Sequence, residues 1–435
     1  MKNIKYIIYS FMLVLGFTAC EIDEAVNPNG PSLNSISNDA SAAELNLLVS
    51  GIEAVIRNGY STYVTSTGTV ARELYKFDAD PRNTEDLLGK EDLTIDNNTF
   101  YLTSPYNNAY RAIKTCNLLL DALDGTKEVD GNEVDGYRGY ANTMKALMYS
   151  RVINMLNDNG LRFDVADPDN LGPFVGKQEA FNSILALLDE ANSQLSGAAF
   201  AFELSSGFAG FDTPSTFALF NRAVAARVAT QAGQYSQALT VVNASFFDID
   251  GVLEAGPKHL FSTNPNDGLN PLFKTPGQSG DQIIVHNDLL ADAEMGDLRL
   301  NKFRERVEAT SQDGLNGTHE TALYDNSTSS IDIIRNEELI LIYAEASIQA
   351  GALGDAVAAL NTIRNAAGLA DYSGAETSEA LIDELLIQRR YSLWGEGHRM
   401  VDLRRYGRLT PEFVPIDRDG DDVFTQFPIP LTENQ

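Results

Sequence analysis

The chain has 435 residues, of which 43% are hydrophobic and 21% are charged, a balance typical of a globular protein rather than a disordered one. Asp and Glu number 61 against 32 Lys and Arg, which gives a formal net charge of −29. Such a charge repels nucleic acid and anionic lipid surfaces, which argues against both as binding partners.

The first residues predict an export signal. Lys2 and Lys5 precede an apolar stretch, residues 7–17, that has the length of a secretory signal core and is too short to span a bilayer as a helix. The small residues before Cys20 resemble a bacterial lipobox, in which the cysteine thiol carries a diacylglycerol. We therefore expect residues 1–19 to be a signal peptide and Cys20 to be the lipidation site. An ordinary signal peptide with a chance cysteine is the alternative.

Residues 20–39 are acidic at first and then rich in Asn, Pro, Gly and Ser, a composition that predicts a flexible tether. The acidic residues directly after Cys20 also resemble the surface-export signal of Bacteroidetes-type lipoproteins. We expect residues 40–435 to form a single domain, with an N-terminal part over residues 40–330 and a C-terminal part over residues 331–435.

Apolar side chains recur at intervals of three and four residues through most of the chain, which predicts amphipathic helices. These helices are expected at residues 41–58, 104–123, 137–157, 178–195, 216–231, 234–244, 337–349, 355–366 and 378–394. Over residues 251–330 the periodicity weakens, and Gly, Pro, Asn and Asp become frequent. A long irregular region in a compact chain is more often functional than idle, so we expect this insertion to be functional.

Two of the predicted helix pairs repeat each other at one common offset. The matching positions are Ala226, Gly233, Ala238 and Asn243 in the first pair and Ala344, Gly351, Ala356 and Asn361 in the second. Small residues let two helices approach closely, and a glycine supplies the left-handed turn that ends the first helix. The pattern resembles a tetratricopeptide pair. The predicted fold is therefore all-α, a scaffold of tetratricopeptide-like helix pairs with large irregular loop insertions.

The C-terminal third carries the most specific pattern. Tyr-Ala-Glu-Ala at residues 343–346 is followed by Leu-Asn-x-Ile-Arg at residues 360–364, and Phe-Pro-x-Pro stands at residues 427–430. The element between them consists of Arg389, Arg390, Leu393, Glu396, Gly397, Arg399, Asp402, Leu403 and Arg405. Together these motifs resemble the C-terminal signature of the SusD/RagB family. Gln388 and Ser392 depart from it, since family members usually carry Glu at both positions.

The resemblance implies a non-catalytic binding protein that is lipid-anchored in the outer membrane of a Bacteroidetes cell and exposed at its surface. Residues 40–435 would then be a SusD-like domain. Such a protein binds a nutrient, most often an oligosaccharide, and delivers it to a SusC-like TonB-dependent transporter. The alternatives are a peptide or another nutrient in the same role, a glycoside-acting enzyme, or a tetratricopeptide-type scaffold for protein interactions.

The spacing of Glu396, Arg399 and Asp402, three residues apart, predicts alternating charges along one helix. We interpret this row as a brace between helices rather than as a site.

No local motif nominates a catalytic or cofactor site. The four histidines lack metal-ligand spacing, and the sequence contains no nucleophile elbow, dinucleotide-binding or Walker motif. Residues 417–422 resemble a calcium loop only superficially, because the glycine comes fourth rather than sixth. Cys116 lies inside a predicted helix, where a small buried residue is expected. We therefore predict no enzyme activity, no catalytic residues, no cofactor and no metal.

The family signature does not indicate where a ligand binds, because ligand sites in this family lie in variable insertions. We therefore select aromatic and polar residues outside the helix-pair core, where stacking and hydrogen-bonding groups could meet a ligand. The ligand-binding candidates are Arg72, Tyr75, Tyr101, Tyr106, Asn107, Phe273 and Tyr324. Local packing is the alternative interpretation of each aromatic residue.

Overall fold

The computed structural model describes residues 39–434, and about half of these residues are helical. The predicted signal peptide, the predicted lipidation site Cys20 and nearly all of the predicted tether lie outside the described residues. Within the described part of the chain, no helix is both long enough and apolar enough to cross a membrane.

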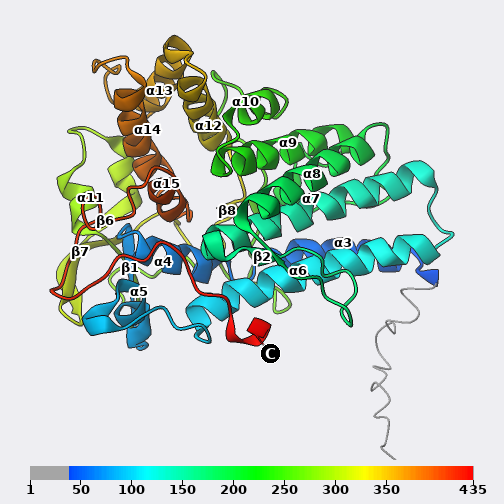
Figure 1. The fold of residues 1–435 in the computed structure, drawn as a ribbon, viewed down its shortest axis with the longest axis horizontal. Coiled ribbons are helices and arrows are strands. Elements are labelled where there is room, and N and C mark those ends of the chain that lie inside the picture. The colour runs from blue at the N-terminus through cyan, green and yellow to red at the C-terminus, as the bar shows by residue number, and fades with distance from the viewer. Residues whose placement is uncertain (1–38, 435) are drawn as a thin grey trace, which may run out of the picture.

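Helices make up most of the regular structure, and strands β1, β6 and β7 lie near one end of it (Figure 1). The helices are α3 (Ala42–Val55), α4 (Tyr60–Val70), α5 (Glu85–Leu88), α6 (Phe100–Gly125), α7 (Gly131–Leu156), α8 (Lys177–Leu195), α9 (Pro214–Gln231), α10 (Tyr235–Asn243), α11 (Asn287–Ala291), α12 (Asn336–Gln349), α13 (Leu353–Ala366), α14 (Ser378–Ser392) and α15 (Arg399–Arg405). The strands are β1 (Leu74–Asp78), β2 (Leu161–Arg162), β3 (Phe174–Val175), β4 (Lys258–His259), β5 (Asp281–Val285), β6 (Phe303–Gln312), β7 (Leu315–Thr321) and β8 (Ile331–Asp332).

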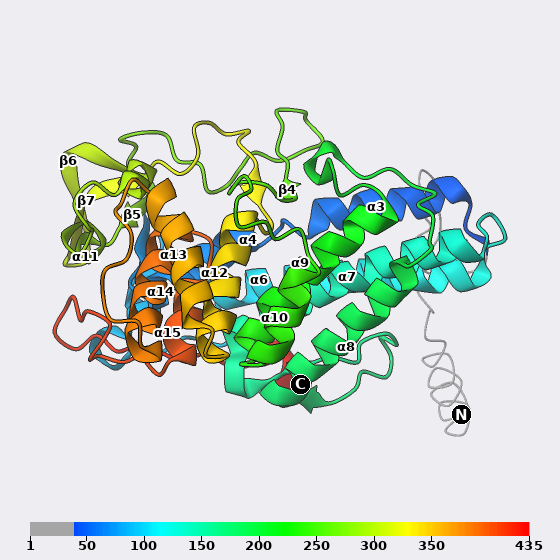
Figure 2. The ribbon, with the colours of Figure 1, turned by 90° about the horizontal axis from the view of Figure 1, so that it is seen from above.

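The two repeated helix pairs form hairpins that pack against each other. Helix α9 packs on α10 and α12 packs on α13, while α10 contacts α12 although the insertion separates them in sequence (Figure 2). Gly233 and Gly351 have φ angles of 72° and 78°, the left-handed conformation that ends the first helix of each hairpin. Ala238 and Ala356, in the second helices, are completely buried. The predicted scaffold of helix pairs with large insertions is confirmed.

The insertion also contributes three strands to a four-stranded antiparallel sheet that the sequence did not predict. Its strand order is β1-β5-β7-β6, and β1, which precedes α6 in the chain, pairs Leu74 with Val285 of β5. Strand β6 leaves most of its side chains exposed or half-buried, and its pairing with β7 shifts register between Glu305 and Thr310. A strand of this kind lacks the regular alternation by which strands are predicted. The expected irregular region is therefore partly a sheet.

Two helices in the N-terminal half differ from the prediction. Helix α6 begins at Phe100 rather than at residue 104, so that Pro105 lies inside the helix instead of at its start. Helix α4, over Tyr60–Val70, was not predicted. It is rich in Thr and Val and is buried on nearly every side, so it has no polar face to reveal a helical period.

Candidate functional site

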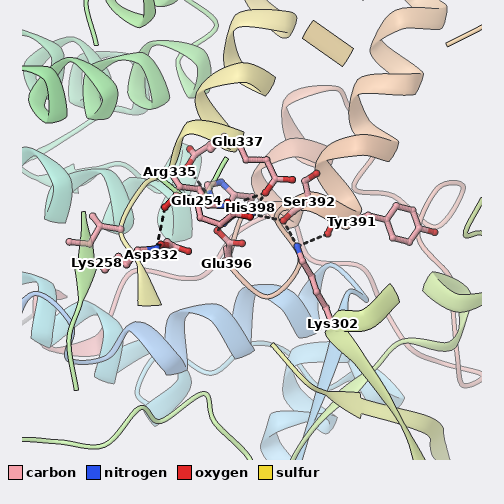
Figure 3. Close-up of polar contacts among 12 residues, drawn as sticks. Glu254, Lys258, Lys302, Asp332, Arg335, Glu337, Tyr391, Ser392, Glu396 and His398 are labelled. Atoms are coloured by element: carbon pink, nitrogen blue, oxygen red, sulfur yellow. Dashed lines mark hydrogen bonds and ion pairs between the residues drawn. The ribbon is translucent and has the colours of Figure 1, made fainter. Parts of the chain in front are cut away.

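A polar cavity of about 380 Å³ lies between the insertion and the beginning of α12. We call it the insertion cavity. Its lining residues are Glu254, Lys302, Leu323, Tyr324, Asp325, Ser329, Ser330, Asp332, Arg335, Glu337 and Glu396. Figure 3 shows that charged side chains from several separate segments converge here. Its volume is within the range of pockets that hold small ligands.

Arg335 organises the ion pairs on one side of the insertion cavity. It occupies the position before the first residue of α12, where its guanidinium lies 2.6 Å from Glu337 and also pairs with Glu396 (Figure 3). Burial alone would raise the pKa of Glu337, but the positive charges of Arg335 and Lys302 outweigh burial and hold that pKa below its usual range. For Glu396, burial outweighs the same guanidinium and raises the pKa. Both carboxyl groups thus already have a partner within the protein.

The one lysine that lines the insertion cavity, Lys302, and the neighbouring Lys258 are engaged as well. Lys302 donates to the backbone carbonyl oxygens of Tyr391 and Ser392, at 3.0 and 2.5 Å, and burial lowers its pKa. Lys258 pairs with Asp332 at the junction of β4 and β8. Among the described residues that line the cavity, no cation is therefore left over for a negatively charged ligand.

The groups that stay available in the insertion cavity are hydroxyls, carboxylates and one aromatic ring. Tyr324 and Ser330 are half-buried, and Glu254 and Asp325 are exposed. Within residues 39–434, the carboxylates of Glu254 and Asp325 and the hydroxyl of Ser330 have no hydrogen-bond partner. Carboxylates accept hydrogen bonds, hydroxyls both donate and accept them, and a tyrosine ring adds an apolar face. This combination suits an uncharged ligand that carries many hydroxyl groups.

Of the seven predicted ligand-binding residues, only Tyr324 lines this cavity. Phe273 is half-buried elsewhere in the insertion, and Asn107 is exposed in the second turn of α6. The structure does not bring either of them to Tyr324.

Two candidate tyrosines at the beginning of α6 are buried and hydrogen-bonded within the protein. The Tyr101 hydroxyl donates to Asp86 at 2.7 Å and accepts from the backbone N–H of Asp96 at 2.6 Å. The Tyr106 hydroxyl donates to Glu433 at 2.8 Å. Both side chains are at most 3% exposed, so they hold the fold together in this state rather than face a ligand.

Arg72 and Tyr75 are buried in the same way. Arg72 donates to three backbone carbonyl oxygens, the shortest contact being 2.5 Å to Asp422. Tyr75 donates to Asp417, a carboxylate of the loop that superficially resembles a calcium site. Arg418 pairs with another carboxylate of that loop, so these acids have protein partners. Within the described residues, no group of three or more His, Cys, Asp or Glu side chains is arranged to hold a metal ion.

The charged residues of the C-terminal signature form a brace, but not in the predicted row. Helix α15 begins at Arg399, so Glu396 lies outside it. Instead, the Asp402 carboxylate forms ion pairs with Arg389 of α14, at 2.7 Å, and with Arg405 of its own helix, at 2.9 Å. These pairs tie α14 to α15 inside the protein, where no ligand reaches them.

Sequence reasoning missed Glu254, Asp325 and Ser330. A lone carboxylate or serine in a stretch rich in Gly, Asn and Asp has no distinguishing spacing, whereas an aromatic residue stands out as a candidate for stacking. Their position in or beside the insertion was the only available signal.

Comparison with known proteins agrees with this fold. Residues 291–429 match the model of the SusD family. No curated protein shows significant similarity to the chain. Surface glycan-binding protein A from Bacteroides thetaiotaomicron, solved in complex with laminarihexaose, superposes with a TM-score of 0.73 at 14% identity, covering 91% of this chain and 97% of that one. A SusD superfamily protein from Bacteroides vulgatus gives 0.69 at 16% identity, covering 91% and 97%. One from Parabacteroides distasonis gives 0.65 at 19% identity, covering 91% and 96%.

Proposed function

Because residues 291–429 match the SusD family model and the fold resembles that of SusD superfamily proteins, we propose that the protein binds an oligosaccharide without transforming it. The family match and the superposition on a glycan-binding protein that holds laminarihexaose support this proposal. The observation that carries it within this chain is the insertion cavity, which is lined by free hydrogen-bonding groups and by Tyr324.

The charge of the insertion cavity favours a neutral sugar over an acidic one. Its lysine and its arginine are engaged by carboxylates or carbonyl oxygens, whereas Glu254 and Asp325 have no partner among the described residues. The whole chain adds a net charge of −29. A uronate or sulfated sugar would meet repulsion with no compensating cation, while a neutral sugar can donate its hydroxyl protons to the two carboxylates.

We further propose that the protein acts at the cell surface as the family does. In this role Cys20 carries the lipid that anchors the protein to the outer membrane, and the captured sugar passes to a SusC-like TonB-dependent transporter. The lipobox-like residues before Cys20 and the family match support this role.

Calorimetric titration with a panel of neutral oligosaccharides, laminarihexaose among them, tests the proposed site. A delivery protein must release its ligand, so we expect a dissociation constant in the micromolar to millimolar range, about −8 to −4 kcal/mol. The double variant Glu254→Gln/Asp325→Asn keeps the shape of the cavity and should weaken binding about tenfold, as should Tyr324→Ala.

Tyr372→Ala is the matched control, because this tyrosine is also half-buried but does not line the insertion cavity. It should leave affinity unchanged. If the wild type binds a sugar and all three cavity substitutions leave the affinity intact, the site lies elsewhere on the protein. If the wild type binds no sugar in the panel, the proposed function itself is wrong.

A further inference from the structure

A second pocket, of about 500 Å³, lies where α14 meets α15, and it shares no residue with the insertion cavity. One face of α14 supplies part of its lining, and α15 and the segment after it supply the rest; Figures 1 and 2 both show these two helices side by side. The lining residues are Glu379, Asp383, Leu386, Ile387, Arg390, Arg399, Leu403, Arg408 and Phe413. We call it the arginine pocket.

Three guanidinium groups meet at this pocket in a chain that has almost twice as many acids as bases. Arg390 pairs with Asp292 at 2.8 Å and Arg408 pairs with Asp383, but both of these carboxylates are more than half exposed. Exposed ion pairs contribute about 0–1 kcal/mol, so either arginine can exchange its partner at little cost.

Arg399 has no such partner. No carboxylate of the described residues lies within ion-pair distance of it, and its one hydrogen bond goes to the backbone carbonyl oxygen of Leu386 at 3.3 Å. Burial, and then the neighbouring charge of Arg390, lower the pKa of Arg399 to about 10. The guanidinium nevertheless stays charged at neutral pH.

Among acidic groups, Glu73 has the largest electrostatic influence on Arg399, but it does not neutralise the positive charge of Arg399. Glu73 is buried, and burial raises its pKa to about 8, so it carries its proton at neutral pH for most of the time. Arg399 and Arg390 therefore repel each other across a pocket in which an added anion would relieve the repulsion.

Two exposed apolar side chains border the same pocket. Phe413 is 50% exposed and Ile387 is 48% exposed. Arg408 lies over the ring of Phe413, with its guanidinium carbon 5.5 Å from the ring centre. A free inorganic anion would not cover these side chains, whereas an anion attached to an apolar body would.

We propose that the arginine pocket binds an acidic segment of a protein partner. One carboxylate of the segment bridges Arg399 and Arg390, because the planar guanidinium fork matches a carboxylate with two parallel hydrogen bonds. An adjacent apolar side chain of the segment covers Phe413 and Ile387. At physiological salt the Debye length is about 8 Å, so these local charges outweigh the distant acidic surface.

The probe is a synthetic, fluorescently labelled peptide in which Glu and Phe alternate, compared with one in which Gln replaces each Glu. Fluorescence anisotropy with the full protein should show binding of the Glu peptide, and binding of the Gln peptide at least about tenfold weaker, because the carboxylates carry the recognition. Arg399→Gln should weaken binding by a similar factor. Arg138→Gln is the control, since this exposed arginine lies on α7, away from the pocket.

Arg390→Gln and Arg408→Gln keep the test decisive if Arg399→Gln does not fold, because both arginines pair with exposed carboxylates. Each should weaken binding of the Glu peptide. Equal binding of the two peptides, or unchanged affinity in these variants, would contradict the proposal. So would displacement of the bound peptide by inorganic phosphate at the same concentration, because the site would then be a simple anion site without an apolar part.

Discussion

Buried ionisable side chains in this protein pair with one another around the C-terminal signature. Arg227 of α9 donates to Glu338 of α12 at 2.6 and 2.5 Å, and Nε2 of His398 lies 3.8 Å from the same carboxylate. Burial would raise the pKa of Glu338, but Arg227 and then His398 lower it to about 2. The pair joins the two repeated hairpins, so its charge state bears on the stability of the scaffold.

His398 predicts how stability depends on pH. Burial lowers its pKa from 6.5 to about 4, so the unfolded chain binds this proton at a higher pH than the folded protein does. Its contribution to stability is complete above pH 6.5 and is lost as the pH falls toward 4, by about 3 kcal/mol in total at 1.36 kcal/mol per unit. Urea unfolding between pH 7.5 and 4 should therefore show a shallower loss in His398→Gln than in the wild type.

His319→Gln is the control for this series, because His319 is half-buried on strand β7 and lies outside the buried network. Its pH profile should follow that of the wild type. Identical profiles for the wild type and His398→Gln would show that His398 is solvated in the folded protein.

At the scale of single elements, the sequence predicted most helices because their apolar stripes repeat regularly. The predicted helix at residues 178–195 matches α8 (Lys177–Leu195) almost residue for residue. Helix α4 and the sheet were not predicted, for opposite reasons. Helix α4 is buried on nearly every side and β6 is largely exposed, so neither shows a regular alternation of apolar and polar residues. Which aromatic residues face a ligand could not be predicted, because tertiary packing decides it: Tyr101 is completely buried, whereas Tyr324 is half-buried.

The close approach of α12 and α13 gives a prediction at the same scale. Ala356 is completely buried in the cluster that these helices form with α14. Ala356→Leu would overpack this contact and should lower the free energy of unfolding by about 1–3 kcal/mol. Ala358→Leu, on the exposed face of the same helix, should change it little. Equal denaturant midpoints for Ala356→Leu and the wild type would mean that the hairpin has spare volume at this position.

For the whole molecule, the helix-pair scaffold supports a sheet and a long insertion, and both the insertion cavity and the arginine pocket include residues of the C-terminal signature. The signature residues themselves are mostly used to brace helices. Most of the residues that line the insertion cavity lie outside the signature, which explains why the sequence indicated a family resemblance but not a ligand.

The most direct test of the central claim is a glycan-array measurement on the purified protein, followed by analysis of the bound sugar. We expect saturable binding to one class of neutral oligosaccharide, with the sugar recovered unchanged after prolonged incubation. Failure to bind any sugar on the array, or recovery of a cleaved or modified sugar, would contradict the account of this protein as a non-catalytic glycan-binding protein.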